Sequence, residues 1–404
     1  MGQQTDTRIN KDRPVRRIVL SGYYGFRNSG DEAVLKSILT ALEEAGAEAG
    51  AKIEPVVLSG DPEWTSRQYG VEAVPRMKLA EVRRALKNSD GLISGGGSLL
   101  QDATGMGSIP YYLGILALAR WCGKPTFVYA QGIGPVNRSL FKPFIARAFK
   151  KAKYVSVRDG ESAALLQGYG VPAEKVEVVP DPVMGLPAGT AETDELSSVS
   201  SGGLGDAHAG TFAAAAPGVA EDARPVVGVS VRFWRDDRAD LDRAAAALEA
   251  LAARAPGGVR LRFLPFHRGS GKDADVDASR YVMERLSCGA ELAPAHDDPQ
   301  RMLREVGRCA LLVGMRLHSL IYAANRGVPL LGISYDPKID QFLGRLGRRA
   351  VGTTEALDPE RFAESALEII HNPAGWLAES GSAIDRLKRE AKRPAQQIID
   401  YLRT

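Results

Sequence analysis

The stretch 310–342, ALLVGMRLHSLIYAANRGVPLLGISYDPKIDQF, brings together an acid–base side chain and two cations. A buried strand is expected to end at Gly314, so Arg316 and His318 stand two residues apart at the start of a helix. The free N–H groups of a helix start favour an anion. The loop after the next strand brings Lys338 to the same strand-end region. The pattern predicts an acid beside an anion-binding site.

Arg158 follows the expected strand YVSV, where a parallel strand meets a cleft. An arginine is well suited to bidentate recognition of a carboxylate or phosphate. An ion pair with the neighbouring Asp159 or Glu161 is the competing interpretation, and the sequence leaves both open.

Two loops of the N-terminal half also follow expected strands. In SGYYGFRNSGDEAVL, Asn28 and Asp31 lie at a helix start, but the glycine spacing departs from GxGxxG and the Asp31 and Glu32 carboxylates would repel a phosphate. We interpret this loop as binding hydroxyl groups, and a helix start capped by Asn28 or Ser29 is the alternative.

The second loop, LISGGGSLLQD, carries three consecutive glycines, Gly95, Gly96 and Gly97. Glycine lets a ligand or another backbone approach closely. Gln131, in YAQGIGP, occupies the end of the next strand. A tight turn is the alternative for both segments, but the position at the carboxyl end of a strand favours a ligand site.

Two further residues follow predicted strands of the C-terminal half and could face the cleft: Arg232 in VSVRFW and His267 in LPFH. No group of histidines and carboxylates has the spacing of a metal site, so no metal is predicted.

Short apolar strands alternate with helical stretches, which indicates parallel α/β sheets. We expect an N-terminal domain over 15–185, an Ala/Gly/Ser-rich linker over 186–224, a C-terminal domain over 225–380 and a terminal helix over 381–404. The predicted architecture is two doubly wound, Rossmann-type domains facing a central cleft.

The composition excludes several classes of protein. The 404 residues are 44% hydrophobic and 25% charged with a formal charge of +3, so the chain is globular and nucleic acid is disfavoured as a partner. No apolar run could serve as a signal peptide or a membrane span, so a cytoplasmic protein is expected. Cys122, Cys288 and Cys309 are too far apart for a CxxC pair and are expected to pack as small apolar residues.

The segment 138–153, RSLFKPFIARAFKKAK, has six basic residues and no acidic one, with aromatic residues between them. Basic amphipathic segments of this kind lie on anionic membrane surfaces, here the inner face of the membrane. A helix that packs its apolar face on the sheet is the alternative.

Taken together, YYGFRNSGDEAVL, SGGGSLLQD, QGIGP, VRDGESA, GMRLHSLIYA and GISYDPKIDQF resemble the polysaccharide pyruvyltransferase family. These motifs extend from about Ser21 to Phe342, and RLHSL followed by SYDPK is the most specific of them.

The resemblance implies a GT-B-like fold and phosphoenolpyruvate as a co-substrate, with no cofactor. The product would be a 4,6-linked pyruvate ketal on a sugar, the acceptor being N-acetylmannosamine in a lipid-linked secondary cell wall polymer precursor that anchors surface-layer proteins.

On this chain, the resemblance makes His318 the general acid, with Arg158 and Lys338 as further catalytic groups. Donor charges would be held by Arg158, Arg316, Lys338, Ser319 and Arg232. The acceptor would lie against Asn28, Asp31, Gly95, Gly96, Gly97, Gln131 and His267.

Two other functions remain open. A GT-B glycosyltransferase would bind a nucleotide sugar, and a non-catalytic cell-wall-glycan binding protein would bind the acceptor without releasing phosphate.

Overall fold

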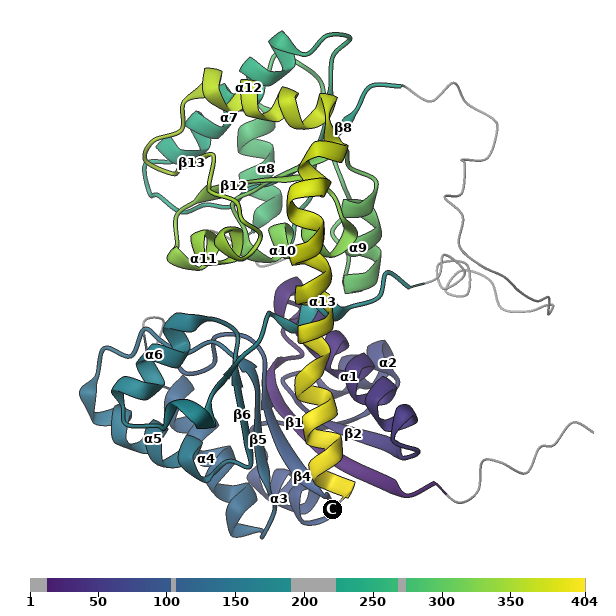
Figure 1. Ribbon diagram of the computed structural model, residues 1–404, viewed down its shortest axis with the longest axis vertical. Coiled ribbons are helices and arrows are strands. Elements are labelled where there is room, and N and C mark those ends of the chain that lie inside the picture. Colours follow the sequence, from purple (N-terminus) through teal and green to yellow (C-terminus); the bar gives the residue numbers. More distant parts are fainter. Residues whose placement is uncertain (1–12, 103–106, 190–222, 268–273, 404) are drawn as a thin grey trace, which may run out of the picture.

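The computed structural model describes residues 13–102, 107–189, 223–267 and 274–403, which form two α/β halves stacked along one axis (Figure 1). Most of the expected linker, 190–222, lies outside the described residues. No described helix is both long and apolar enough to cross a membrane.

The first half contains a seven-stranded parallel sheet in the order β3-β2-β1-β4-β5-β6-β7. Its elements are β1 (Val15–Tyr24), α1 (Ser29–Glu48), β2 (Lys52–Ser59), α2 (Pro62–Tyr69), β3 (Glu72–Pro75), α3 (Leu79–Lys87), β4 (Gly91–Gly95), α4 (Ser108–Trp121), β5 (Thr126–Gln131), η1 (Ser139–Phe141), α5 (Lys142–Lys151), β6 (Tyr154–Val157), α6 (Gly160–Gly168), η2 (Ala173–Lys175), β7 (Glu177–Val178) and η3 (Pro182–Gly185). The central strands β4 and β5 are buried along their whole length, because helices cover both faces of the sheet.

The second half contains a six-stranded parallel sheet in the order β10-β9-β8-β11-β12-β13. Its elements are β8 (Val226–Ser230), α7 (Ala239–Arg254), β9 (Arg260–Phe263), α8 (Asp275–Met283), β10 (Ala290–Leu292), α9 (Pro299–Gly307), β11 (Leu311–Gly314), α10 (Leu317–Arg326), β12 (Leu330–Ser334), α11 (Pro337–Arg345), β13 (Gly352–Thr353) and α12 (Pro359–His371). The two doubly wound α/β units predicted from the sequence are confirmed.

In each sheet the strand order reverses beside the first strand, between β1 and β4 and between β8 and β11. Ligands of doubly wound sheets bind in the crevice outside the carboxyl ends of the strands at such a reversal. The loops that follow these four strands are therefore the part of the fold that can position a site.

The last helix, α13 (Pro373–Arg403), is longer than the segment 381–404 expected from the sequence. Gly375 and Gly381 lower the helix propensity of its first turns, but tertiary packing overrides them. Trp376 is buried against the second half, and the Arg348 guanidinium lies 5.0 Å from its ring centre.

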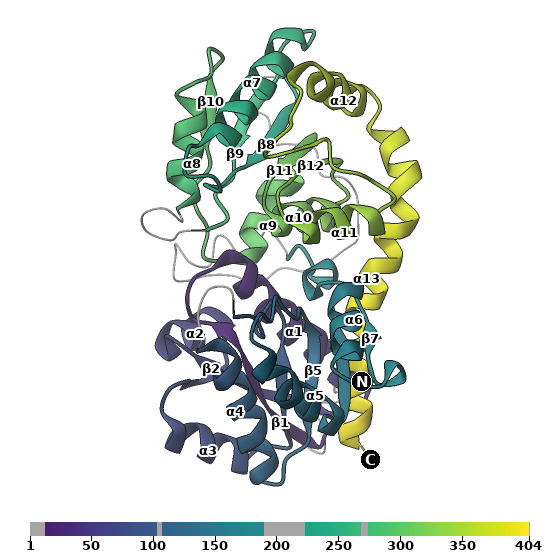
Figure 2. The same cartoon turned by 90° about the vertical axis from the view of Figure 1, so that its left-hand side faces the viewer.

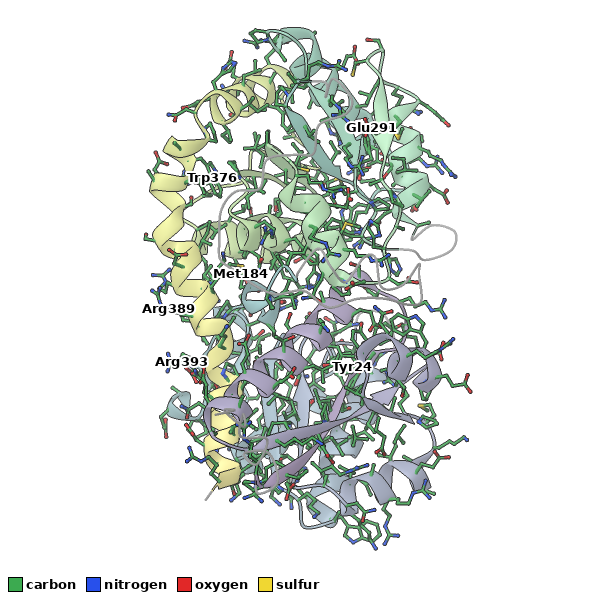
Figure 3. All side chains as sticks on the ribbon, turned by 90° about the vertical axis from the view of Figure 1, so that its right-hand side faces the viewer. Tyr24, Met184, Glu291, Trp376, Arg389 and Arg393 are labelled. Carbon is green, nitrogen blue, oxygen red and sulfur yellow. The ribbon has the colours of Figure 1, made fainter. Side chains whose placement is uncertain are left out.

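Helix α13 then returns along the first half, as Figure 3 shows from Trp376 to Arg393. Lys392 pairs with Glu44 of α1 at 2.8 Å, and Arg393 pairs with Glu177 of β7 at 2.8 Å. The helix therefore connects the two halves.

A second connection is the short helix η3, which contacts α1, α10 and α13. The buried Asn325 amide of α10 lies within hydrogen-bond distance of three carbonyl oxygens, of Val183 at 2.9 Å, Met184 at 3.0 Å and Leu186 at 2.9 Å. Met184 lies at the junction of the halves in Figure 3. The Asn325 side chain of the second half thus holds η3, the last helical turn of the first half.

We expect Asn325→Leu to destabilise the protein by about 2–4 kcal/mol, because three carbonyl oxygens lose the side-chain amide that donates to them. The measurement is the free energy of unfolding in denaturant. The matched control is Asn372→Ala, at an exposed helix cap, which should cost about 1 kcal/mol. An equal loss in both variants would contradict the proposed role of Asn325.

Candidate functional site

The carboxyl ends of the two sheets face each other, and the loops after β1 and β9 join across the gap. Asn28 and His267 form an antiparallel backbone bridge between the halves. The Asn28 side chain accepts a hydrogen bond from the Gly30 N–H at 3.1 Å and so caps α1. The cap interpretation of this loop is therefore correct, and the same residue also lies at the interdomain cleft.

His318, in the first turn of α10, reaches across the cleft to α1. A Cβ atom added to Gly30 would lie 2.4 Å from the His318 Nδ1 atom, so the imidazole packs directly on the glycine. The other ring nitrogen, Nε2, lies 3.7 Å from the Asp181 carboxylate, and the side chain keeps 23% of its surface exposed. The imidazole is thus held between a glycine and a carboxylate, and its buried Nε2 atom has no hydrogen-bond partner among the described residues.

The Asp181 carboxylate, just before η3, is buried and faces two cationic groups. Arg158 lies 3.4 Å from it, and Arg158 also donates a hydrogen bond to the Ser98 hydroxyl at 2.8 Å. Burial raises the pKa of Asp181, but His318, Arg158 and the Val183 N–H outweigh it and hold the pKa below its usual range. Asp181 therefore stays ionised and places a negative charge beside the His318 imidazole.

Asp31, in the first turn of α1, has the opposite electrostatics. Burial raises its pKa to about 7, although the positive charges of His318 and Arg158 act against this shift. Its carboxylate lies against Gly97, where an added Cβ atom would come within 2.9 Å. Asp31 is thus a carboxyl group that titrates near neutral pH beside an imidazole.

Lys338 and Arg158 line one cavity of about 40 Å³, together with Asp181. The Lys338 ammonium is paired with Asp336 at 3.3 Å, and the Arg158 guanidinium also lies 3.7 Å from Asp159. The structure brings these two predicted residues together, and it also contains the ion pair that the sequence left open for Arg158.

Arg316 is engaged by a residue that sequence analysis missed, the buried Asp275. This carboxylate accepts hydrogen bonds from Arg316 Nε at 2.8 Å and from the backbone N–H groups of Phe266 and His267 at 3.0 and 2.9 Å. Ser319 donates its hydroxyl hydrogen to the Arg316 carbonyl at 2.7 Å. These residues form a cluster on the C-terminal side of the cleft.

Arg232 lies apart from the Asp181 cavity. It lines a pocket of about 750 Å³ with Trp234, Arg238 and Tyr281, and its Nη1 donates to the Tyr335 hydroxyl at 3.2 Å. A donor-binding role for Arg232 stays a prediction.

The three glycines of the predicted loop have different neighbours in the structure. An added Cβ atom at Gly96 would lie 1.8 Å from the Val34 side chain, and the Gly95 carbonyl accepts the Tyr24 hydroxyl at 2.7 Å. Gly95 and Gly96 therefore lie at packing contacts of the first half. Gly97, in contrast, lies against Asp31, a predicted site residue. Gln131 is fully buried, and its side-chain amide has no hydrogen-bond partner among the described residues.

A larger pocket of about 980 Å³ opens beside Asp31 and Asn28, and its lining includes the aromatic residues Tyr23, Phe26, Tyr111 and Tyr112. Tyr23 and Phe26 stack with ring centres 4.1 Å apart and an angle of 8° between their planes. The Arg76 guanidinium lies 5.4 Å from the Phe26 ring centre and 4.3 Å from that of Tyr111.

Sequence reasoning missed this aromatic surface as well as Asp181, Asp275 and Ser98. Two signals were present: the aromatic residues inside SGYYGF, and an aspartate three residues after the end of β7 in VVPDP. Among the described residues, no group of three or more His, Cys, Asp or Glu side chains could hold a metal ion.

The comparisons with known proteins extend over most of the chain. The family model described as "Polysaccharide pyruvyl transferase" matches residues 28–337. No curated protein matches the sequence.

Two solved structures illustrate the likeness in fold. The UDP-GlcNAc 2-epimerase of Methanocaldococcus jannaschii has a TM-score of 0.62 at 9% identity, over 96% of this chain and 99% of that one. The UDP-GlcNAc 2-epimerase of Neisseria meningitidis, bound to UDP-GlcNAc, has a TM-score of 0.56 at 11% identity, over 96% and 99%. At such low identity the likeness shows the GT-B-like fold alone.

The raised pKa of Asp31 predicts a pH-dependent effect of Asp31→Asn on stability. The folded state binds this proton more tightly than the unfolded chain, so wild-type stability decreases as the pH rises from about 4 to about 7. The amide cannot titrate, so the variant should match the wild type near pH 4 and be more stable by about 2–4 kcal/mol at pH 8.

Denaturant unfolding at several pH values measures this difference. Asp385→Asn, at an exposed aspartate of α13, is the control and should show no such pH dependence. A constant difference between Asp31→Asn and wild type would show that Asp31 titrates as an ordinary carboxyl group.

Proposed function

The chain belongs to the polysaccharide pyruvyl transferase family, and on this premise we propose that it moves the enolpyruvyl group of phosphoenolpyruvate onto a sugar. The product is a 4,6-linked pyruvate ketal, and phosphate is released. We place it with the CsaB-like members, whose acceptor is N-acetylmannosamine in a lipid-linked secondary cell wall polymer precursor.

The observation that carries the proposal is the pairing of His318 with Asp181 in the interdomain cleft, 3.7 Å apart. The lowered pKa of Asp181 keeps its carboxylate ionised, so a negative charge lies beside the imidazole. His318 can therefore deliver a proton to the methylene carbon of the donor, which becomes a methyl group. A positive charge then develops on the neighbouring carbon.

The remaining protons come from the two acceptor hydroxyls. The first hydroxyl adds to the cationic carbon and gives its proton to a base; phosphate leaves; the second hydroxyl closes the ketal. One of these two protons restores the proton that His318 gave to the methyl group. The other leaves on the phosphate. Asp31 is our candidate base, because a carboxyl group with a pKa of about 7 can accept a proton near neutral pH.

The charges of the donor suit the cations of the cleft. Phosphoenolpyruvate has a carboxylate and a phosphate and needs several fixed cations. Arg158 and Lys338 line one small cavity beside Asp181. Arg316 precedes His318 by two residues and is held by Asp275. These cations are preorganised by carboxylate partners before the donor binds.

The aromatic pocket beside Asp31 suits the acceptor. Sugar rings present apolar C–H faces that pack on aromatic rings, and their hydroxyls need hydrogen-bond partners. Tyr23 and Phe26 provide an exposed stacked pair, and Asn28 and Asp31 lie in the same pocket. An acceptor bound there would present its hydroxyls toward His318.

The direct test incubates the protein with phosphoenolpyruvate and a panel of N-acetylhexosamine lipid analogues. We expect a mass gain corresponding to a pyruvate ketal and an equal amount of phosphate. His318→Ala should lower the rate by about 10²–10⁴-fold and leave donor binding nearly intact.

Two other outcomes would overturn the assignment. Turnover of a UDP-sugar without phosphoenolpyruvate would identify a glycosyltransferase, and acceptor binding without phosphate release would identify a glycan-binding protein. Near-normal turnover by His318→Ala would remove this residue from the mechanism.

Donor binding provides a separate prediction. Arg158→Ala, Arg316→Ala and Lys338→Ala should each weaken phosphoenolpyruvate binding by about 1.5–3 kcal/mol per lost charged hydrogen bond, as measured by titration calorimetry. Arg158→Lys should also bind the donor weakly if the contact is bidentate, because an ammonium cannot reproduce the planar fork. If Arg158→Ala binds phosphoenolpyruvate as tightly as the wild type does, the donor contacts only the C-terminal half.

A further inference from the structure

Helices α3, α4 and α5 cover one face of the first sheet, and Figure 2 shows them on the side toward the viewer. Their sequences contain eight basic residues and a single acidic one, Glu81. The basic residues are Arg83, Arg84, Lys87, Arg120, Lys142, Arg147, Lys150 and Lys151. We call the outer surface of these three helices, with the adjoining residues 77–78 and 139–141, the basic face.

No described carboxylate forms an ion pair with any of these eight side chains, although arginines elsewhere, such as Arg262, pair with carboxylates. Arg120 of α4 and Arg147 of α5 are close enough to interact electrostatically. Burial and the charge of Arg147 lower the pKa of Arg120, and Arg120 Nη1 has no hydrogen-bond partner within the described chain. The positive charge of these eight side chains is therefore not neutralised by ion pairs within the described residues.

The same face exposes large apolar side chains. The exposed fractions are 73% for Met77, 63% for Leu79, 72% for Trp121, 67% for Leu140 and 57% for Phe144. These are five of the twelve large hydrophobic residues that are exposed in the described chain. The Arg83 guanidinium lies 4.9 Å from the Trp121 ring centre, which places an aromatic ring next to a cation on this surface.

The inner side of α5 provides the packing contacts of this helix. Ile145 and Phe149 are fully buried in the core beneath the helix. The packing interpretation of the segment 138–153 is therefore confirmed for the inner side of the helix, whereas its outer side carries Phe144, Lys150 and Lys151.

We propose that the basic face is a docking surface for an anionic lipid membrane, on which the protein lies peripherally. Lysine and arginine attract anionic headgroups, while exposed Trp, Leu and Phe side chains insert at the level of the headgroups. Charge alone would suit any polyanion, but the protruding apolar side chains among the cations favour a lipid surface.

The basic face adjoins the pocket in which the proposed function places the sugar acceptor. Met77 belongs both to the basic face and to the lining of the 980 Å³ pocket, and Tyr111 of α4 also lines that pocket. The pocket therefore lies at the edge of the basic face, where a lipid-linked sugar could enter it without leaving the membrane.

Vesicle co-sedimentation of the full chain tests the proposal. We expect binding to vesicles of phosphatidylglycerol and phosphatidylcholine, and little to phosphatidylcholine alone. The triple variant Arg147→Gln, Lys150→Gln and Lys151→Gln should bind about a hundredfold more weakly, at about fivefold for each charge. The matched control removes three exposed arginines elsewhere, Arg349→Gln, Arg361→Gln and Arg389→Gln, and should bind like the wild type.

Insertion of the apolar side chains is tested by quenching of tryptophan fluorescence with brominated lipids. We expect quenching in the wild type and its loss in Trp121→Phe, because Trp64 and Trp376 are buried and Trp234 lies in the other half. Equal vesicle binding by the two triple variants, or quenching that persists in Trp121→Phe, would overturn the proposal. So would binding to heparin or single-stranded DNA with none to anionic vesicles.

Transfer to a short water-soluble acceptor separates this proposal from the proposed function. The Arg147/Lys150/Lys151 variant should transfer to such an acceptor at the wild-type rate. Absence of transfer in the wild type would count against the proposed reaction and leave the vesicle results unaffected.

Discussion

The buried carboxylate of Asp181 is the contact on which the cleft depends. It caps η3, lies 3.4 Å from Arg158 at the end of β6 and faces His318 of α10 at 3.7 Å. A buried charge is costly unless it is paired and hydrogen-bonded. Both halves of the molecule must therefore keep their relative position for Asp181 to retain its partners. Asn325, which holds the turn after Asp181, and α13, which lies along both halves, serve this requirement.

The electrostatics of the cleft differ on the two sides of His318. Burial dominates at Asp31 and raises its pKa to about 7, whereas cationic and N–H partners dominate at Asp181 and lower its pKa. Titratable groups whose environments separate their pKa values are typical of acid–base sites. The arrangement gives one carboxyl group that can exchange a proton at neutral pH and one that stays charged.

Glycine permits the close contacts of this cleft. The His318 ring occupies the space of a missing Cβ atom at Gly30, and Asp31 packs on Gly97. A side chain at Gly30 would push the imidazole away from α1 and from Asp181. Gly30 and Gly97 thus make room for side chains of the cleft, and two carboxylates lie in the first turn of α1.

The sequence by itself determined the α/β alternation, the loops at the strand ends and the presence of Arg158, Asp31 and His318 on them, because periodicity and glycine positions are local signals. Only the tertiary structure decided which groups meet. Asp181 contacts His318, 137 positions away by residue number, and Asp275 holds Arg316 from another helix. The aromatic pocket likewise combines residues from the loops after β1 and β3 with residues of α4. Such contacts depend on how two sheets are packed against each other, and no local pattern records that packing.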